Sequence, residues 1–284
     1  MSMKLRKAER KQARIKLGLQ GPSGSGKTYS ALLIAYGLCG DWNKIVVIDS
    51  ENNSSDLYEH LGDYNVLPIK APFSPEKYSE AITACENEGM EVIIVDSCSH
   101  EWESSGGILD IHSKMPGNSF ANWNQLTPRH NAFVQKMLQS PAHIIATIRT
   151  KQDYVLTDKG GKYVPEKVGL KGITREGLDY EMTVVLDLDL KHNAVASKDR
   201  TGLFMNKPHF KVTTSTGKKI KQWCLSGVSL DQVRKHIRET DTMDDLMDIY
   251  DRYPEFREQI TPDLTRRKKI ISDSVAEFEN NQNN

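Results

Sequence analysis

The residues most clearly suited to chemistry are eight consecutive positions near the N-terminus. They read Gly21-Pro22-Ser23-Gly24-Ser25-Gly26-Lys27-Thr28 and satisfy G-x-x-x-x-G-K-[ST] throughout. In such a P-loop the glycines let backbone N–H groups curl around phosphates, the lysine reaches the β- and γ-phosphate oxygens, and the last hydroxyl ligates Mg²⁺. The sequence therefore predicts a nucleoside triphosphate site in which Lys27 takes part in catalysis and Thr28 is a metal ligand.

Acidic residues that end two apolar runs could complete this chemistry. Asp96 follows the run 92–95 and is predicted to hold the magnesium ion through its water shell. Asp49 and Glu51 end the run 45–48, where either carboxylate could orient or deprotonate an attacking water. Because open α/β sheets bind ligands at the carboxyl ends of their strands, we expect these acids to lie near the P-loop.

The elements that must position these residues follow from short, continuous apolar runs rich in β-branched residues. Such runs are typical of parallel strands covered on both faces, and they occupy 15–19, 44–49, 65–69, 91–96, 143–148 and 182–186. Helical patterns at 28–38, 75–88 and 127–138 alternate with them. The sequence predicts an α/β fold with a mostly parallel, twisted sheet flanked by helices. Strands at 194–197 and 209–214 are predicted to form a β-hairpin extension, and 104–118 a flexible connection.

The chain is predicted to have four parts. A basic N-terminal arm occupies residues 1–14, the nucleotide-binding core 15–225, a helical module 226–276 and a disordered tail 277–284. Ser229 is a predicted N-cap for the first helix of the module. The asparagine-rich tail has too little apolar surface to fold by itself.

The amino-acid composition argues against several classes of protein. The 284 residues carry 38 basic and 38 acidic side chains, so any surface for nucleic acid must come from local segregation of charge. The four cysteines form no C-x-x-C pair, which disfavours a zinc finger or a disulfide scaffold. No apolar run reaches about 18 residues, the length of a membrane helix. We expect a reduced, cytoplasmic protein with no membrane partner.

Four segments together resemble the RecA-type recombinase ATPase core: 44–51, 56–58, 92–97 and 147–151. The resemblance spans about residues 15–215 and is nearest to AAA-type nucleotide-binding proteins of phages and prophages, in the single-strand-annealing or recombination-mediator group. It implies a RecA-like fold, ATP with Mg²⁺ as cofactors, and Glu51 as the catalytic base. It also implies a DNA-stimulated ATPase that serves phage-type recombination, annealing or replication.

The same resemblance gives a role to two basic residues, Lys198 and Arg200. RecA-type ATPases often project such a pair into the nucleotide site of the next subunit, where the cations would stabilise charge on the γ-phosphate. That role implies a homo-oligomer. The alternative for this segment is an exposed turn between two strands.

A polar segment after the strand at 143–148 is the predicted contact with single-stranded DNA. The resemblance implies that Thr147, Arg149 or Gln152 is a sensor coupling nucleotide state to a DNA-binding loop over 149–171. Cations suit phosphates and aromatic faces suit unstacked bases, and the candidate DNA-binding residues here are Lys151, Tyr154, Lys159, Lys162, Tyr163 and Lys167. An ordinary solvated hairpin is the alternative.

Other functions also use a P-loop. A GTPase is disfavoured because the residues at 96–99, Asp-Ser-Cys-Ser, lack the glycine of D-x-x-G. A P-loop small-molecule kinase, a helicase-type or packaging motor, and a nucleotide-gated binding module with negligible turnover stay open. Two roles stay open for the C-terminal helices: docking of an annealing protein or a single-strand-binding protein, or simply capping the core.

Overall fold

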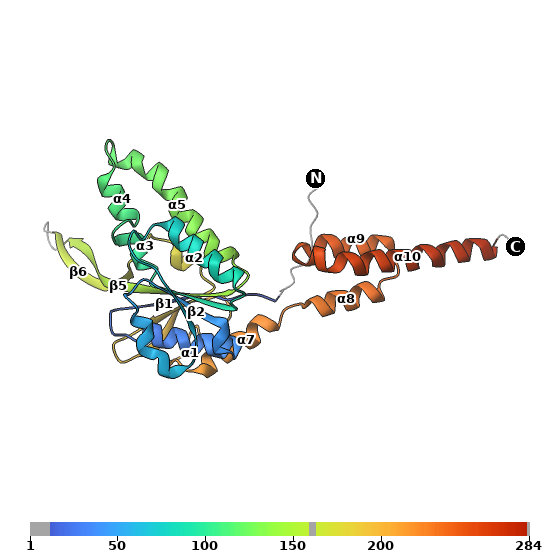
Figure 1. The fold of residues 1–284 in the computed structure, drawn as a ribbon, viewed down its shortest axis with the longest axis horizontal. Coiled ribbons are helices and arrows are strands. Elements are labelled where there is room, and N and C mark those ends of the chain that lie inside the picture. Colours follow the sequence, from blue (N-terminus) through green and yellow to red (C-terminus); the bar gives the residue numbers. More distant parts are fainter. Residues whose placement is uncertain (1–11, 159–162, 283–284) are drawn as a thin grey trace. The chain divides into compact units, whose positions relative to one another are not determined.

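The computed structural model describes residues 12–158 and 163–282 (Figure 1). The described chain forms two compact units. One unit comprises Arg14–Trp223, and the other contains residues 12–13 and 224–282. Most of the predicted basic arm, residues 1–11, lies outside the described part of the chain.

The first unit is built on one mixed sheet whose strand order is β3-β2-β4-β5-β1-β7-β8-β9, with β6 paired to β5. The bounds are β1 Lys16–Gly21, β2 Ile45–Asp49, β3 Asn65–Pro68, β4 Val92–Asp96, β5 His143–Asp158, β6 Tyr163–Gly172, β7 Val184–Leu188, β8 Asn193–Asp199 and β9 Phe210–Lys211. From β3 to β7 all pairs along this order are parallel, whereas β8 and β9 join in antiparallel fashion. The predicted α/β fold with a mostly parallel sheet is confirmed.

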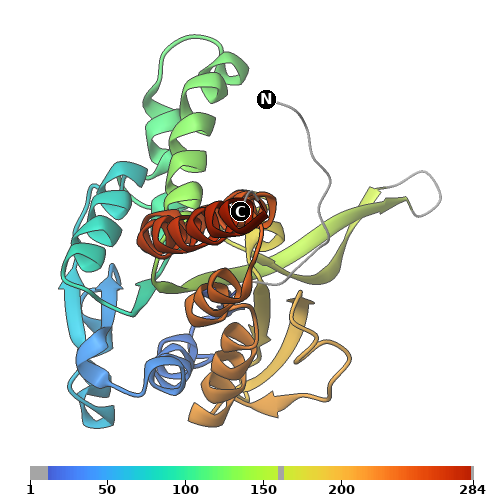
Figure 2. The same ribbon diagram turned by 90° about the vertical axis from the view of Figure 1, so that its right-hand side faces the viewer.

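Helices cover both faces of this sheet (Figures 1 and 2). The bounds are α1 Lys27–Cys39, α2 Pro75–Asn87, α3 Ser99–Glu103, α4 Ile108–Lys114, α5 Ser119–Gln139, α6 Leu178–Glu181 and α7 Thr214–Leu225, with 3₁₀ helices η1 at Trp42–Lys44 and η2 at Ser54–Leu61. On one face α2 and α5 pack through Tyr78, Ile82 and Phe133 against β2, β4 and β5. On the other face α1 meets α7 at Gly37 and Gly217, where a Cβ at either position would collide with backbone of the facing helix.

Three segments differ from the sequence predictions. The stretch 104–118 contains α4, and α5 begins at Ser119 rather than near 127, because the Asn118 side chain accepts hydrogen bonds from the N–H groups of Phe120 and Ala121. The predicted DNA-binding loop 149–171 is a β-hairpin, since β5 continues past the sheet and pairs with β6. The predicted strand pair at 194–197 and 209–214 corresponds to β8 and the much shorter β9.

The second unit is a small helical assembly. It contains α8 Leu230–Glu239, α9 Met243–Arg252, η3 Pro254–Phe256 and α10 Arg257–Gln282. Ser229 caps α8 through a capping box with Gln232. The buried core consists of Val233, Ile237, Leu246, Ile249, Tyr253, Ile260 and Ile271. Helix α10 extends beyond residue 276, where the sequence predicts the start of a disordered tail. None of the helices in the described ranges is long and apolar enough to cross a membrane.

A buried histidine at the start of β5 makes the stability of the first unit depend on pH. His143 is 4 % exposed, and its Nδ1 accepts the N–H of Ile15 at 3.0 Å. Burial, with the nearby Arg14 and Lys16, lowers the pKa of His143 from 6.5 to about 3. As the pH falls, His143 is therefore protonated in the unfolded chain before it is protonated in the folded one. The contribution of the neutral His143 to the free energy of unfolding is fully present above about pH 6.5 and is lost as the pH falls towards 3.

We expect this linkage to cost about 2 kcal/mol of unfolding free energy between pH 7.5 and pH 5. His143→Asn keeps an acceptor near the Nδ1 position but has no group that titrates in this range. Urea denaturation at the two pH values should show a loss about 2 kcal/mol smaller in the variant than in the wild type. Equal losses would contradict the assignment.

Candidate active site

The predicted P-loop connects the carboxyl end of β1 to the first turn of α1. Gly24 and Gly26 have φ values of 80° and 84°, a left-handed conformation that favours glycine. At Gly21 a Cβ would lie 2.5 Å from the carbonyl oxygen of Leu188. The Lys27 ammonium donates to the carbonyl oxygens of Gly21 and Pro22, at 3.0 Å each. The backbone thus has the turn and the helix start on which phosphate binding depends.

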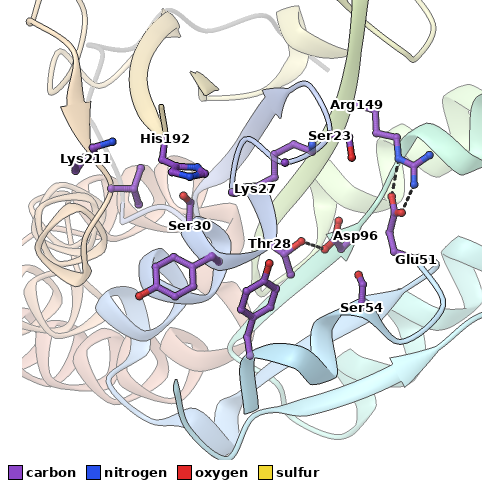
Figure 3. Close-up of a pocket in the computed structure, with 15 residues that line it drawn as sticks. Ser23, Lys27, Thr28, Ser30, Glu51, Ser54, Asp96, Arg149, His192 and Lys211 are labelled. Atoms are coloured by element: carbon purple, nitrogen blue, oxygen red, sulfur yellow. Dashed lines mark hydrogen bonds and ion pairs between the residues drawn. The ribbon is translucent and has the colours of Figure 1, made fainter. Parts of the chain in front are cut away.

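A pocket of about 680 Å³ opens beside this loop (Figure 3). It is lined by Ser23, Gly24, Gly26, Lys27, Thr28, Tyr29, Ser30, Glu51, Ser54, Tyr58, Asp96, Arg149, His192, Lys211 and Val212. The fold therefore brings Lys27, Thr28, Glu51 and Asp96, which the sequence analysis singled out, to one cavity at the carboxyl edge of the sheet.

Asp96 joins three elements of this pocket. Its carboxylate is 2 % exposed and accepts the Thr28 hydroxyl at Oδ2 and the Thr147 hydroxyl at Oδ1, each at 2.5 Å. Burial raises the pKa of Asp96, and these two hydrogen bonds oppose the rise.

The same oxygens suit magnesium. Thr28 and Asp96 present a hydroxyl and a carboxylate side by side, and both are hard oxygen donors. Across the described residues no group of three or more His, Cys, Asp or Glu side chains could hold a metal ion. Since Mg²⁺ usually takes one or two protein oxygens and completes its shell with water and phosphates, this donor set fits the predicted ion.

Glu51 is bonded to one side chain at the pocket wall and lies near a second. Arg149 forms a two-point ion pair with it, in which Nε donates to Oε1 at 2.8 Å and Nη2 donates to Oε2 (Figure 3). On another side His100 Nε2 lies 3.8 Å from Oε1. The Glu51 side chain is 19 % exposed, whereas the Arg149 side chain is partly open to solvent. Both carboxylate oxygens are engaged by the guanidinium in this arrangement.

Of the three candidate sensors, Arg149 is the one that lines the pocket. Thr147 is buried against Asp96. Gln152 lies on the hairpin, where its side-chain amide donates to the carbonyl oxygen of Gly169 at 2.6 Å.

Lys198 and Arg200 lie away from the pocket of their own chain. Strand β8 runs antiparallel to β7 and pairs Asp199 with Val184, so its end lies at the amino edge of the parallel sheet, opposite the P-loop. There the Lys198 ammonium donates to the carbonyl oxygens of Asp179 and Tyr180, and the Arg200 guanidinium donates to that of Tyr180 at 2.9 Å. Partial burial, with the neighbouring Arg200, lowers the pKa of Lys198. Their action in a neighbouring subunit stays a prediction.

Four of the candidate DNA-binding residues, Lys151, Tyr154, Tyr163 and Lys167, lie on strands β5 and β6. Lys151 is exposed on β5. The backbone of Tyr154 pairs with that of Lys167, and Asp158 pairs with Tyr163, but the side chains of Tyr154, Tyr163 and Lys167 lie outside the described part of the structure. Lys159 and Lys162 also lie outside the described residues.

Sequence reasoning missed several residues of the pocket, of which His192 is the clearest. His192 occupies the turn between β7 and β8 with φ 61°, and its Nδ1 would lie 3.1 Å from a Cβ at Gly26. The Asp189 carboxylate accepts the N–H groups of Lys191 and Asn193 and shapes this turn. The nearest signal in the sequence was the position of the turn directly after a strand. A turn after a strand indicates a pocket residue only when that strand is known to end beside the P-loop, and this follows from the parallel pairing of β7 with β1.

Two threonines of β5 allow a matched test of the Asp96 network. Thr147→Val removes the hydroxyl that donates to Oδ1 of the buried Asp96 carboxylate, and we expect a loss of about 1–3 kcal/mol of unfolding free energy. Thr150 is the control, because its buried hydroxyl has no hydrogen-bond partner among the described residues. Thr150→Val should cause no loss of stability in the same urea titration, because removing a buried hydroxyl that has no partner is neutral or stabilising. Equal stability of the two variants would contradict a structural role for the Thr147 bond.

Comparison with known proteins agrees with this geometry. A protein-family model described as an AAA domain matches residues 13–218, a range that contains the P-loop, Asp96 and Arg149. No curated protein matches the chain in sequence. The match covers the parallel sheet and the entire pocket. The chain therefore belongs to the AAA domain family of P-loop nucleoside triphosphatases.

Proposed function

We propose that this protein is a magnesium-dependent, RecA-like ATPase that acts on single-stranded DNA in phage-type recombination, annealing or replication. The observation that carries the ATPase part is the convergence of Lys27, Thr28, Asp96 and Glu51 on one pocket from three separate strand ends. Family membership supports nucleotide binding. The DNA part is supported by the sequence resemblance and by the place of the β5–β6 hairpin.

Each residue has a role that follows from its position. Bound magnesium would neutralise phosphate charge, with Thr28 as its ligand and Asp96 holding it through water. Lys27 turns from the loop carbonyls to the β- and γ-phosphate oxygens. Glu51 accepts a proton from water as the water oxygen bonds to the γ-phosphorus. The bond from that phosphorus to the β,γ-bridging oxygen breaks, which leaves ADP and phosphate.

Arg149 is the residue that would respond to the γ-phosphate. It is paired with Glu51 at the pocket wall, and a phosphate oxygen competes well with a carboxylate for a guanidinium. Arg149 also stands where β5 leaves the sheet and becomes the hairpin, which pairs from Thr150 onward. A change of partner at Arg149 would therefore act at the base of the proposed DNA-binding element.

A second candidate function is a nucleotide-gated binding module with negligible turnover. The observation in its favour is the Glu51–Arg149 pair, which engages both oxygens of the proposed base. In such a module ATP would order the hairpin or an oligomer interface without rapid hydrolysis. Measured turnover separates the two functions.

The proposed assembly is a homo-oligomer. Lys198 and Arg200 lie at the sheet edge opposite the P-loop, so a neighbour stacked head to tail would present them to the nucleotide. An annealing protein or a single-strand-binding protein is the proposed further partner of the C-terminal helices.

The first test is steady-state ATP hydrolysis by the purified protein with and without single-stranded DNA. We expect DNA to raise turnover severalfold, because the hairpin and the proposed base are joined through Arg149. Lys27→Ala measures contaminating activity. Glu51→Gln should lower turnover by about 10²–10⁴-fold and leave ATP binding nearly intact. Equal turnover with and without DNA would contradict the DNA role. Equal turnover of Glu51→Gln and the wild type would contradict the assignment of Glu51 as the base.

The oligomer is tested with subunits that have complementary defects. Arg200→Ala alone should reduce turnover by about 10³-fold or more, the range of an arginine finger. Mixing it with Lys27→Ala should restore activity, because some interfaces then combine an intact P-loop with an intact Arg200. Arg238→Ala, an exposed substitution in α8, should behave as wild type. Failure of the mixture to recover activity would contradict action between subunits.

A further inference from the structure

His100, in the first turn of α3, is a buried polar residue with one side directed at the pocket wall. Its side chain is 11 % exposed. Its Nδ1 lies 2.8 Å from the hydroxyl oxygen of Ser50, the residue directly before Glu51. The ring thus contacts the segment that carries the proposed base, although α3 follows a different strand.

The imidazole is fixed on two further sides. Ser50 is itself buried, and its hydroxyl oxygen accepts the N–H of Ser97 at 2.9 Å, so it is a stable anchor for Nδ1. The Phe73 ring packs against the imidazole with ring centroids 5.2 Å apart. The direction of Nε2 is therefore set by surrounding groups.

Nε2 lies 3.8 Å from Oε1 of Glu51. The charged groups that face this imidazole are the Glu51 carboxylate at the end of β2 and, beyond it, the Arg149 guanidinium on β5. The segment before α2 contributes the uncharged Phe73 ring. Glu51 is thus paired with an arginine whose side chain is 38 % exposed, and it faces a histidine whose ring is fixed by its neighbours.

We propose that His100 is a positioning residue for Glu51, which keeps the carboxylate aimed at the attacking water when Arg149 turns to the γ-phosphate. This inference rests on the proposed ATPase function. Once the guanidinium leaves, the carboxylate, which lies 3.8 Å from Nε2, needs to move by about 1 Å to accept a hydrogen bond from Nε2–H. The neutral ring carries its proton on Nε2 when Nδ1 accepts the Ser50 hydroxyl. Catalytic hydrogen bonds are often long before substrate binds. Holding the base in one orientation raises the rate of the chemical step, because small misplacements of reacting groups lower that rate strongly.

Two amide substitutions test this role. The short side chain of His100→Asn reaches the Nδ1 position and keeps the bond to Ser50, but it does not reach Glu51. The longer side chain of His100→Gln places an amide near the Nε2 position. We expect kcat to fall about 10-fold or more in the Asn variant and to stay within about 3-fold of wild type in the Gln variant. KM and the affinity for a non-hydrolysable ATP analogue should be unchanged in both.

The outcomes separate this inference from the proposed function. Wild-type turnover that needs Glu51 but is the same in His100→Asn would overturn the positioning role alone. A Gln variant as slow as the Asn variant would also overturn the positioning role, because the Gln amide supplies a hydrogen bond to Glu51 and would then fail to restore kcat. Absence of Glu51-dependent turnover in the wild type would overturn the proposed function together with this inference. His60→Asn, at an exposed position of η2, should match wild type and controls for general effects of the substitution.

Discussion

The candidate site depends above all on the buried carboxylate of Asp96. Burial disfavours the ionised form of a carboxyl group so far from water, and here hydrogen bonds from two threonine hydroxyls oppose that effect. One hydroxyl belongs to the start of α1 and the other to β5, while Asp96 ends β4. The same interaction therefore ties the P-loop helix to the two central strands that adjoin it, and it sets the donor pair that suits magnesium.

Charge balance in the pocket explains how the remaining residues are arranged. Two basic residues, Lys27 and Arg149, line the pocket together with two acidic residues, Asp96 and Glu51. Burial lowers the pKa of Lys27, while Asp96 and Glu51 act against that shift. Each cation is engaged by oxygens of the protein, Lys27 by loop carbonyls and Arg149 by Glu51. Triphosphate oxygens offer both cations stronger partners, so nucleotide binding would rearrange these contacts.

Helix α3 shows how the pocket is connected to the rest of the first unit. Ser99 accepts the backbone N–H of Arg149, and His100 approaches Glu51. The next residue, Glu101, is fully buried and bonds to His130 on α5. Burial raises the pKa of Glu101, and the bond to His130 opposes the rise. Consecutive residues of one short helix thus contact the proposed base, the proposed sensor and the long helix α5.

The sequence by itself determined the P-loop, the continuous apolar strands and the α/β class, because local spacing and periodicity encode phosphate cradles and buried parallel strands. It also placed Asp96 and Glu51 at strand ends. Only the tertiary structure decided which distant residues meet there. Arg149 reaches Glu51 across 98 positions and His192 packs on Gly26, since strand order, set by packing of the whole sheet, has no local signature. The direction of β8 likewise put Lys198 and Arg200 at the edge opposite the P-loop, because an antiparallel return brings the end of one strand beside the start of its neighbour.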